Sequence, residues 1–213
     1  MERTTNLDRA KKIMGKNFIG LSELLSVQKD MGIFIPDELA GKLPEVNFPE
    51  GLLSNCRDEY LLILGSPYYK DETPLTIKKM RDHFGFNPEL GEPCFYNQDW
   101  YINEDFFNKQ LDYKWYLLRK SVIDETRAKD PDSVTLKILF PSAVLCAYMF
   151  FVCWHHFHEP LWSKDYIWCS DHDHNGDRIY VGRYIDPHGI NKNGFSIHRH
   201  LSISNIYGCI NVL

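Results

Sequence analysis

Histidines are the most concentrated reactive side chains in this sequence, because eight of the nine lie in its C-terminal third. They include three His-x-His pairs. Residues two apart on a strand share one face, so such a pair can present two imidazoles to one metal ion. His198 and His200 fit this geometry best and predict a zinc site. The alternative is that both rings lie on the polar, solvent-exposed face of their strand. A third ligand is available from the preceding acidic segment, as Asp171, His172 or Asp173.

The acidic segment 171–177, which reads DHDHNGD, is a second candidate cation site. Calcium loops use oxygen ligands at alternate positions and a glycine for the sharp turn. The candidate ligands are therefore Asp171, Asp173, Asn175 and Asp177. Position 12 of such a loop is Gly182 instead of a bidentate glutamate, and strands are expected to flank the segment, which argues against an EF-hand. A cation loop of another kind and a polar hairpin turn stay open. We expect no cofactor, with calcium or zinc as the alternatives.

Nucleophilic catalysis has a single loose candidate, Cys169, which lies close to Asp171 and His172 in the sequence. Strand alternation sends Cys169 to the face opposite Trp168, which predicts a buried structural thiol. The six cysteines form no CxxC pair and are expected to be reduced. The sequence contains no GxSxG, P-loop or GxGxxG motif, which argues against the common hydrolase, NTPase and dinucleotide-binding classes.

Aromatic residues are the remaining signal, at 14% of the chain. Tyrosine and tryptophan offer large, rigid, amphipathic contact area, so rings carried by loops suit recognition of a protein or a sugar. The other interpretation is that these rings pin long loops to the core. The candidate ligand-binding residues are Trp100, Tyr101, Tyr180 and Tyr184.

The elements that must position these residues are predicted in the order of mainly helices first and then strands along the chain. Helices are predicted over 7–14 and 21–31, followed by a surface connector containing Pro36, Pro44 and Pro49. Thr73 and Pro74 predict the start of a helix that closes near Gly85. The segment 143–154 is apolar on every side, which is typical of a central buried helix, and it is too short to span a membrane. Strands are expected at 60–64 and 114–119, and a short helix at 121–129.

The last third of the chain predicts a β meander. Strands at 166–170 and 178–185 flank Asn175-Gly176, a strong hairpin signal. The segment 195–203 alternates apolar and polar residues, with Arg199 on the apolar face, and a last short strand is expected at 207–212. The predicted fold is α+β: a small twisted antiparallel sheet with a buried helix. We divide the chain into an N-terminal helical arm and connector, 1–50, and a single α+β domain, 51–213.

Four stretches of the C-terminal half resemble C-type-lectin-like folds of the bacterial and phage type related to formylglycine-generating enzymes. They are PSAVLCAYMFF at 141–151, YIWCSD at 166–171, GDRIYVGRY at 176–184 and the closing strand. The resemblance covers about residues 110–213. It implies a small antiparallel sheet with helices on one side and variable ligand-binding loops. The lectin triplets EPN, QPD and WND do not occur, and no catalytic cysteine pair aligns, so neither activity is implied.

Composition restricts the class of protein further. The chain has 213 residues and a formal charge of −5, and no run of Lys or Arg suggests nucleic-acid binding. Its polar start lacks a signal peptide, so we expect a cytoplasmic protein without membrane segments. The function predicted is a non-enzymatic binding module for a protein or glycan, of phage, mobile-element or bacterial origin. A purely structural accessory role stays open. The alternative is a metal-dependent hydrolase that uses the His/Asp cluster of the C-terminal third.

Overall fold

Six α-helices are present in the computed structural model, which describes residues 4–134, 138–188, 193–199 and 203–213. They are α1 (Leu7–Met14), α2 (Leu21–Met31), α3 (Asp37–Ala40), α4 (Glu50–Cys56), α5 (Ile77–Phe84) and α6 (Ala143–Phe157). Short 3-10 helices lie in the connections: η1 (Gly15–Asn17), η2 (Pro88–Leu90), η3 (Asp105–Asn108), η4 (Asp124–Thr126) and η5 (Pro131–Ser133). A mixed α+β fold is therefore confirmed.

The described strands form three small sheets. Their bounds are β1 (Phe18–Ile19), β2 (Ile33–Phe34), β3 (Tyr60–Leu64), β4 (Tyr68–Tyr69), β5 (Trp115–Arg119), β6 (Tyr166–His172), β7 (Arg178–Tyr184), β8 (Gly194–His198) and β9 (Tyr207–Gly208). The sheet orders are β1-β3-β5, β2-β4 and β8-β7-β6-β9. In the first sheet β1 runs parallel to β3, and β3 runs antiparallel to β5.

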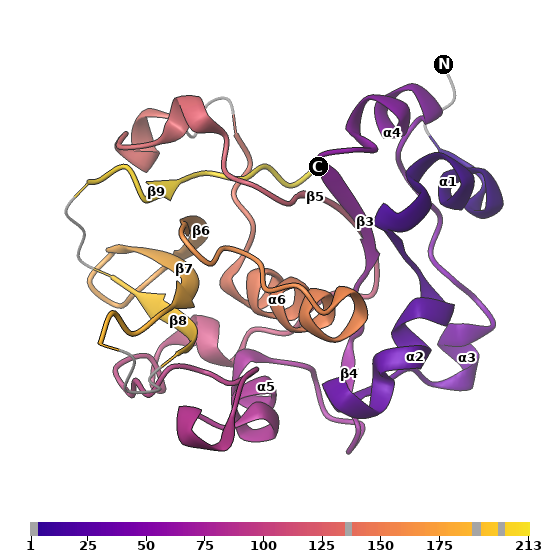
Figure 1. Ribbon diagram of the computed structural model, residues 1–213. Helices are drawn as coiled ribbons and strands as arrows, with labels where there is room; N and C mark the ends of the chain where they lie inside the picture. Colours follow the sequence, from indigo (N-terminus) through magenta and orange to yellow (C-terminus); the bar gives the residue numbers. More distant parts are fainter. Residues whose placement is uncertain (1–3, 135–137, 189–192, 200–202) are drawn as a thin grey trace.

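Helix α6 occupies the centre of the molecule, between the β3-β5 side and the β6-β8 side (Figure 1). Its first eleven residues are all buried, which confirms the predicted buried helix. Ser142 caps its start by accepting a hydrogen bond from the backbone N–H of Leu145. Across the described residues, no helix has both the length and the apolar content that crossing a bilayer would require.

The first fifty residues contribute to the same core. The helices predicted at 7–14 and 21–31 are confirmed at those bounds. Strand β1 pairs with β3, and α2 packs against α6. Buried residues of this segment, among them Leu24 and Met31, belong to the main hydrophobic cluster together with α6. The division of the chain at residue 50 stays a prediction.

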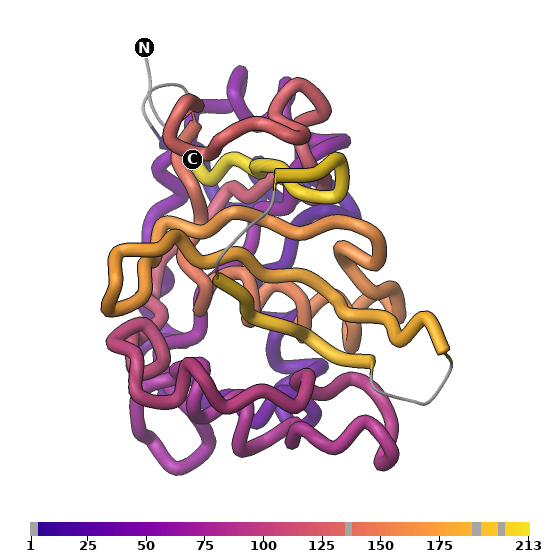
Figure 2. The backbone as a smooth tube through the Cα atoms, turned by 90° about the vertical axis from the view of Figure 1, so that its left-hand side faces the viewer, coloured from indigo at the N-terminus to yellow at the C-terminus, as the bar shows by residue number. Residues whose placement is uncertain are grey.

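The C-terminal sheet combines the predicted meander with a parallel edge. Strands β6, β7 and β8 pair antiparallel, and the predicted hairpin joins the first two. The prediction of a wholly antiparallel sheet is wrong at its edge, because β9 runs parallel to β6. Strands β8 and β9 therefore run in the same direction at opposite edges of this sheet. Figure 2 shows β6 to β8 side by side at the front of the molecule.

Two helices predicted between residues 73 and 129 differ from the structure. The helix expected from Pro74 begins at Ile77, with Thr76 as its N-cap. Thr73 instead accepts a hydrogen bond from the backbone N–H of Tyr69, so the chain is still extended there. The helix expected over 121–129 is only the single turn η4.

Candidate functional site

The outward-facing side chains of β6, β7 and β8 form a row of rings across the sheet. Trp168 lies opposite Tyr180, and Tyr180 lies opposite His198. The ring centroids of Trp168 and Tyr180 are 5.5 Å apart, and His198 stacks on Tyr180 at 5.1 Å with 17° between the ring planes. Because side chains alternate along a strand, Ile167 and Val181 point the other way and join the main core with α6.

A second row lies next to the first. Tyr166 of β6 pairs with Tyr207 of β9, with 5.4 Å between their ring centroids. The neighbouring position on β7 is Gly182. A Cβ atom at Gly182 would lie 2.8 Å from the Tyr166 ring and 2.6 Å from the carbonyl oxygen of Asp165. The missing side chain therefore lets the Tyr166 ring lie over β7, where it meets the Tyr180 ring edge-on at 5.6 Å.

Two further tyrosines extend the surface toward the end of β7. The rings of Tyr184 and Tyr96 lie 4.5 Å apart. The backbone N–H of Tyr96 donates to the carbonyl oxygen of Phe195, which ties the loop before it to β8. The strands that carry these rings face the viewer in Figure 2. This surface, the outer aromatic face, consists of Tyr96, Tyr166, Trp168, Tyr180, Tyr184, His198 and Tyr207.

The outer aromatic face has a buried centre and an accessible rim. Trp168 and Tyr180 are 4% and 6% exposed, and they form a small hydrophobic cluster with Phe140 and Cys209 that is separate from the main core. The other members are partly exposed. The partly exposed tyrosines at the rim offer both ring surface and a hydroxyl group, a combination suited to contacts with a partner.

Two buried nitrogens of the outer aromatic face, Trp168 Nε1 and His198 Nε2, have no hydrogen-bond partner in the part of the chain that the structure describes. The side-chain oxygen of Gln98 accepts from the backbone N–H of Ile197, so its Nε2 faces His198 Nδ1 at 3.3 Å. An amide nitrogen only donates; Nδ1 therefore accepts, and the proton of neutral His198 is assigned to Nε2. Burial lowers the pKa of His198 to about 4, which keeps the ring neutral at pH 7. Both orphaned groups are thus N–H donors that lack an acceptor.

The two predicted loop aromatics serve mainly to hold their loop. Tyr101 is completely buried, so its ring has no surface for a partner. Trp100 Nε1 donates to the carbonyl oxygen of Ile197 at 3.0 Å, and the Arg199 guanidinium lies 4.6 Å from its ring centroid. Of the four predicted contact residues, the structure brings Tyr180 and Tyr184 onto one face and places Trp100 and Tyr101 in the adjoining loop.

The acidic segment 171–177 is organised around Asp173, whose side chain is fully buried. Its Oδ1 accepts from the backbone N–H groups of Asn175 and Asp177, and its Oδ2 accepts from Arg199 at 2.8 Å. Burial by itself would raise the pKa of Asp173, but the hydrogen bond from Arg199 and those from the two backbone groups lower it to about 2. Asp171 is used elsewhere, since it accepts from Lys109 and from the first backbone N–H of α6, that of Ala143.

One carboxylate–histidine cluster has ligand atoms close enough to hold a metal ion within the described residues: Glu104, Asp173 and His174, all within 4.8 Å of one another. Glu104 is 6% exposed and accepts from both the backbone N–H and Nδ1 of His174. Arg199 lies 2.8 Å from Asp173 and 4.0 Å from Glu104. The guanidinium thus supplies the positive charge that a cation would bring. His198 lies outside this cluster, and His200 lies outside the described residues.

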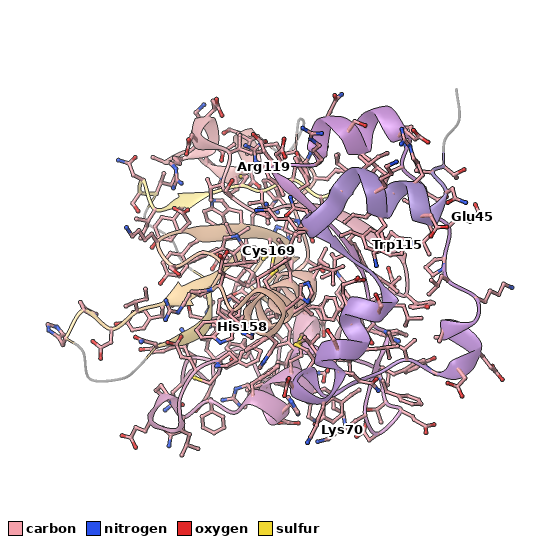
Figure 3. The ribbon with its side chains drawn as sticks, turned by 45° about the vertical axis from the view of Figure 1, so that its right-hand side comes forward. Glu45, Lys70, Trp115, Arg119, His158 and Cys169 are labelled. Atoms are coloured by element: carbon pink, nitrogen blue, oxygen red, sulfur yellow. The ribbon has the colours of Figure 1, made fainter. Side chains whose placement is uncertain are left out.

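A nucleophilic role for Cys169 does not fit its position. Cys169 is fully buried beside α6 in the interior (Figure 3), and burial raises its pKa well above the ordinary value. A thiol kept protonated in this way is a poor nucleophile. All six cysteines are free and buried, as expected of reduced structural thiols.

The chain matched no protein-family model, no curated protein and no solved structure when it was compared with each. Its function is therefore inferred from its own residues. Four members of the outer aromatic face were not among the predicted site residues: Tyr166, Trp168, Tyr96 and Tyr207. The alternation of rings with Ile167 and Cys169 was a sequence signal for the first two. The sequence holds no comparable signal that joins Glu104 to the acidic segment.

Proposed function

We propose that this protein is a non-enzymatic binding module, and that a glycan or a protein surface binds to its outer aromatic face. The observation that carries the proposal is the pairing of clustered rings with two buried, unpaired N–H donors at Trp168 and His198. Leaving a buried donor unpaired costs about 1–3 kcal/mol, so such groups are rare in folded proteins. Both nitrogens are closed to solvent, so a ligand that offers oxygen acceptors would recover this energy where the surrounding side chains move apart to admit it.

The chemistry of the rim favours a neutral, oxygen-rich ligand. Each rim tyrosine can stack its ring on an apolar ring face or on the backbone of a ligand. Its hydroxyl can then form a hydrogen bond with a polar group of that ligand. Sugar hydroxyls and backbone carbonyls both supply the acceptors that the two N–H groups lack. We also propose that this chain is a cytoplasmic protein and that it binds neither nucleic acid nor membranes.

The test combines a glycan array with a screen of purified candidate proteins. Tyr184→Ala and Tyr207→Ala remove partly exposed rings from the outer aromatic face, and Tyr68→Ala on β4 removes a partly exposed ring elsewhere. We expect the first two variants to weaken binding of any ligand found by about tenfold or more, and Tyr68→Ala to leave it unchanged. A ligand that binds all three variants as tightly as the unaltered chain would place the site elsewhere. Failure of both screens would overturn the proposal.

The resemblance to C-type-lectin-like folds leads to a proposal about the fold of the C-terminal half. We propose that residues from about 110 to 213 adopt a C-type-lectin-like fold of the type related to formylglycine-generating enzymes, in a protein of phage, mobile-element or bacterial origin. Support comes from the order of elements: a helix opened by Ser142, the β6-β7 hairpin, and a last strand, β9, beside the first strand of its sheet.

A metal-dependent hydrolase is the second candidate, favoured by the cluster of Glu104, Asp173 and His174. It predicts about one equivalent of zinc or calcium in protein purified without a polyhistidine tag. Against it, Arg199 already neutralises Asp173 at 2.8 Å. We expect elemental analysis to find less than one-tenth of an equivalent (about 0.1) in folded protein. A stoichiometric metal that is lost on Asp173→Asn substitution would favour the hydrolase over the binding module.

A further inference from the structure

A cavity of about 190 Å³ lies at the C-terminal end of α6. Four segments meet there: η1 after the first helix, Leu61 of β3, the residue that follows β5, and the last turns of α6 with the chain beyond it. None of its lining residues belongs to β6–β9. The residues that define its chemistry are Lys16, Asn17, Lys120, Cys153, Phe157 and Leu161.

The cavity brings together two ammonium groups. Lys16 is exposed and Lys120 is partly buried, and within the described residues neither forms an ion pair with a carboxylate. The Lys120 ammonium donates to the side-chain oxygen of Asn17 at 3.0 Å. Asn17 is buried, and its side-chain nitrogen donates to the carbonyl oxygen of Arg57, which fixes the amide so that its oxygen faces Lys120. An ammonium has three protons, so two of those on Lys120 are left for a ligand.

The position of Lys120 makes its charged form less favourable. Burial lowers its pKa, and the nearby charge of Lys16 lowers it further, whereas the thiol of Cys153 and the carboxylates of Asp58 and Glu159 act in the opposite direction. A negative group bound between the two lysines would offset both unfavourable effects.

The rest of the wall combines apolar side chains with the exposed carboxylate of Glu159. Leu61 and Cys153 are fully buried in its wall, and Phe157 and Leu161 are partly exposed. An apolar cavity of about 150 Å³ is large enough to hold benzene. The present cavity is somewhat larger, at about 190 Å³, and its wall offers apolar side chains together with two ammonium groups, which suits a ring or short chain that ends in an anionic group.

We propose that this cavity binds a small monocarboxylate with an apolar body, about the size of benzoate, whose carboxylate is held by Lys120 and Lys16. The apolar body packs on Phe157 and Leu161. Glu159, also in the lining, disfavours a second negative charge on the ligand, which selects a monoanion over inorganic phosphate.

The test uses benzoate as the probe and measures its dissociation constant by isothermal titration or ligand-observed NMR. Lys120→Met keeps the apolar stem and removes the charge, and we expect it to weaken benzoate binding by about tenfold or more. Lys70→Met is the matched control, because Lys70 lies on the opposite side of the view from Arg119, the neighbour of Lys120 (Figure 3). The control should bind benzoate as the unaltered chain does, and neutral benzyl alcohol should bind about tenfold more weakly than benzoate.

A second variant keeps the proposal testable if Lys120→Met does not fold. Lys16 is exposed, so Lys16→Met is tolerated, and we expect a severalfold loss of affinity for benzoate. The proposal is overturned by any of three results: no benzoate binding to the unaltered chain, equal binding to the Lys16 variant, or tighter binding of inorganic phosphate than of benzoate.

Discussion

His198 shows how the sheet changes the chemistry of a single residue. Its place in a His-x-His pair suggested a metal ligand, yet its ring stacks on Tyr180 and its Nδ1 accepts from Gln98. Burial, with no carboxylate beside it, lowers its pKa to about 4. An imidazole held neutral in this way contributes one donor and one stacking surface, which suits recognition of a neutral ligand.

The lowered pKa of His198 predicts a loss of stability in acid. In the unfolded chain the pKa returns to about 6.5, so below that pH the unfolded state binds a proton that the folded state does not. Stability should fall as the pH drops from about 6.5 toward 4, by about 1–2 kcal/mol at pH 5. Urea unfolding of the unaltered chain and of His198→Phe at several pH values measures the contribution of His198 to this pH dependence. The variant should lack that contribution. His172→Gln, at an exposed histidine, is the control; an equal loss of pH dependence in it would contradict the assignment.

Asp173 should be the most sensitive carboxylate of the acidic segment. Asp173→Asn keeps an oxygen for the turn but removes the charge opposite Arg199, leaving a partly buried guanidinium with only Glu104 at 4.0 Å. Removing one partner of a buried ion pair costs about 3–5 kcal/mol. Because Arg199 keeps Glu104 nearby, we expect Asp173→Asn to lower the free energy of unfolding by about 2–3 kcal/mol, which denaturant unfolding measures. Asp58→Asn, in an exposed pair with Arg57, should change stability by less than about 0.5 kcal/mol, and similar losses in both variants would refute the role.

At the scale of elements, local patterns were sufficient where one segment fixes its own structure. Helices α1 and α2, strand β3 and the buried helix α6 follow from periodicity and apolar runs alone. The start of α5 was missed because Thr73 and Pro74 carry a good helix-start signal, whereas the bond from Tyr69 N–H to Thr73 and the bridge between Tyr68 and Pro74 pair these two residues with β4. These contacts depend on β4, which no local pattern encodes.

The candidate site was less predictable than the elements that carry it. Alternation placed Tyr180 and Tyr184 on one face correctly, but it says nothing about which strand lies alongside. The neighbours Tyr207 and Tyr96 arrive through the parallel pairing of β9 and through a loop bonded to β8. The same limit hid the partner of Arg199: its position on the apolar face was visible in the sequence, but Asp173 and Trp100 were not identifiable as its contacts.

Glycine positions give a paired test of the sheet. Gly182→Ala would place a methyl group 2.6 Å from the Asp165 carbonyl oxygen and 2.8 Å from the Tyr166 ring, so we expect a loss of about 1–3 kcal/mol. Gly51→Ala in α4 meets no atom within 4 Å and should raise stability by about 0.5–1 kcal/mol through helix propensity. Thermal unfolding of both variants measures the difference. Equal effects of the same sign would show that Tyr166 does not lie over β7 in solution.

At the scale of the whole molecule, α6 connects regions that the sequence suggested were separate. It packs against α2 on one side and against β6, β7 and β8 on the other. The last residues of the chain add a second link, because Leu213 N–H donates to Leu117 of β5 and the N–H of Arg119 donates to Asn211. Shared burial of this kind favours a single cooperative unfolding transition.

Phe151 is the residue that tests this coupling. Its ring stacks on Phe84 of α5 at 3.9 Å and lies 5.9 Å from Phe195 of β8, so Phe151→Leu loosens the packing of α6 against α5 and against β8. Native-state hydrogen exchange should show the slowest amides of α2 and of β7 losing the same protection, about 1–2 kcal/mol. Leu25→Ala, at an exposed leucine of α2, should leave both unchanged. If β7 alone lost protection while α2 kept it, the first fifty residues would unfold as a unit of their own. The predicted boundary at residue 50 would then describe the molecule better than the shared core does, because cooperativity, rather than contact, defines a domain.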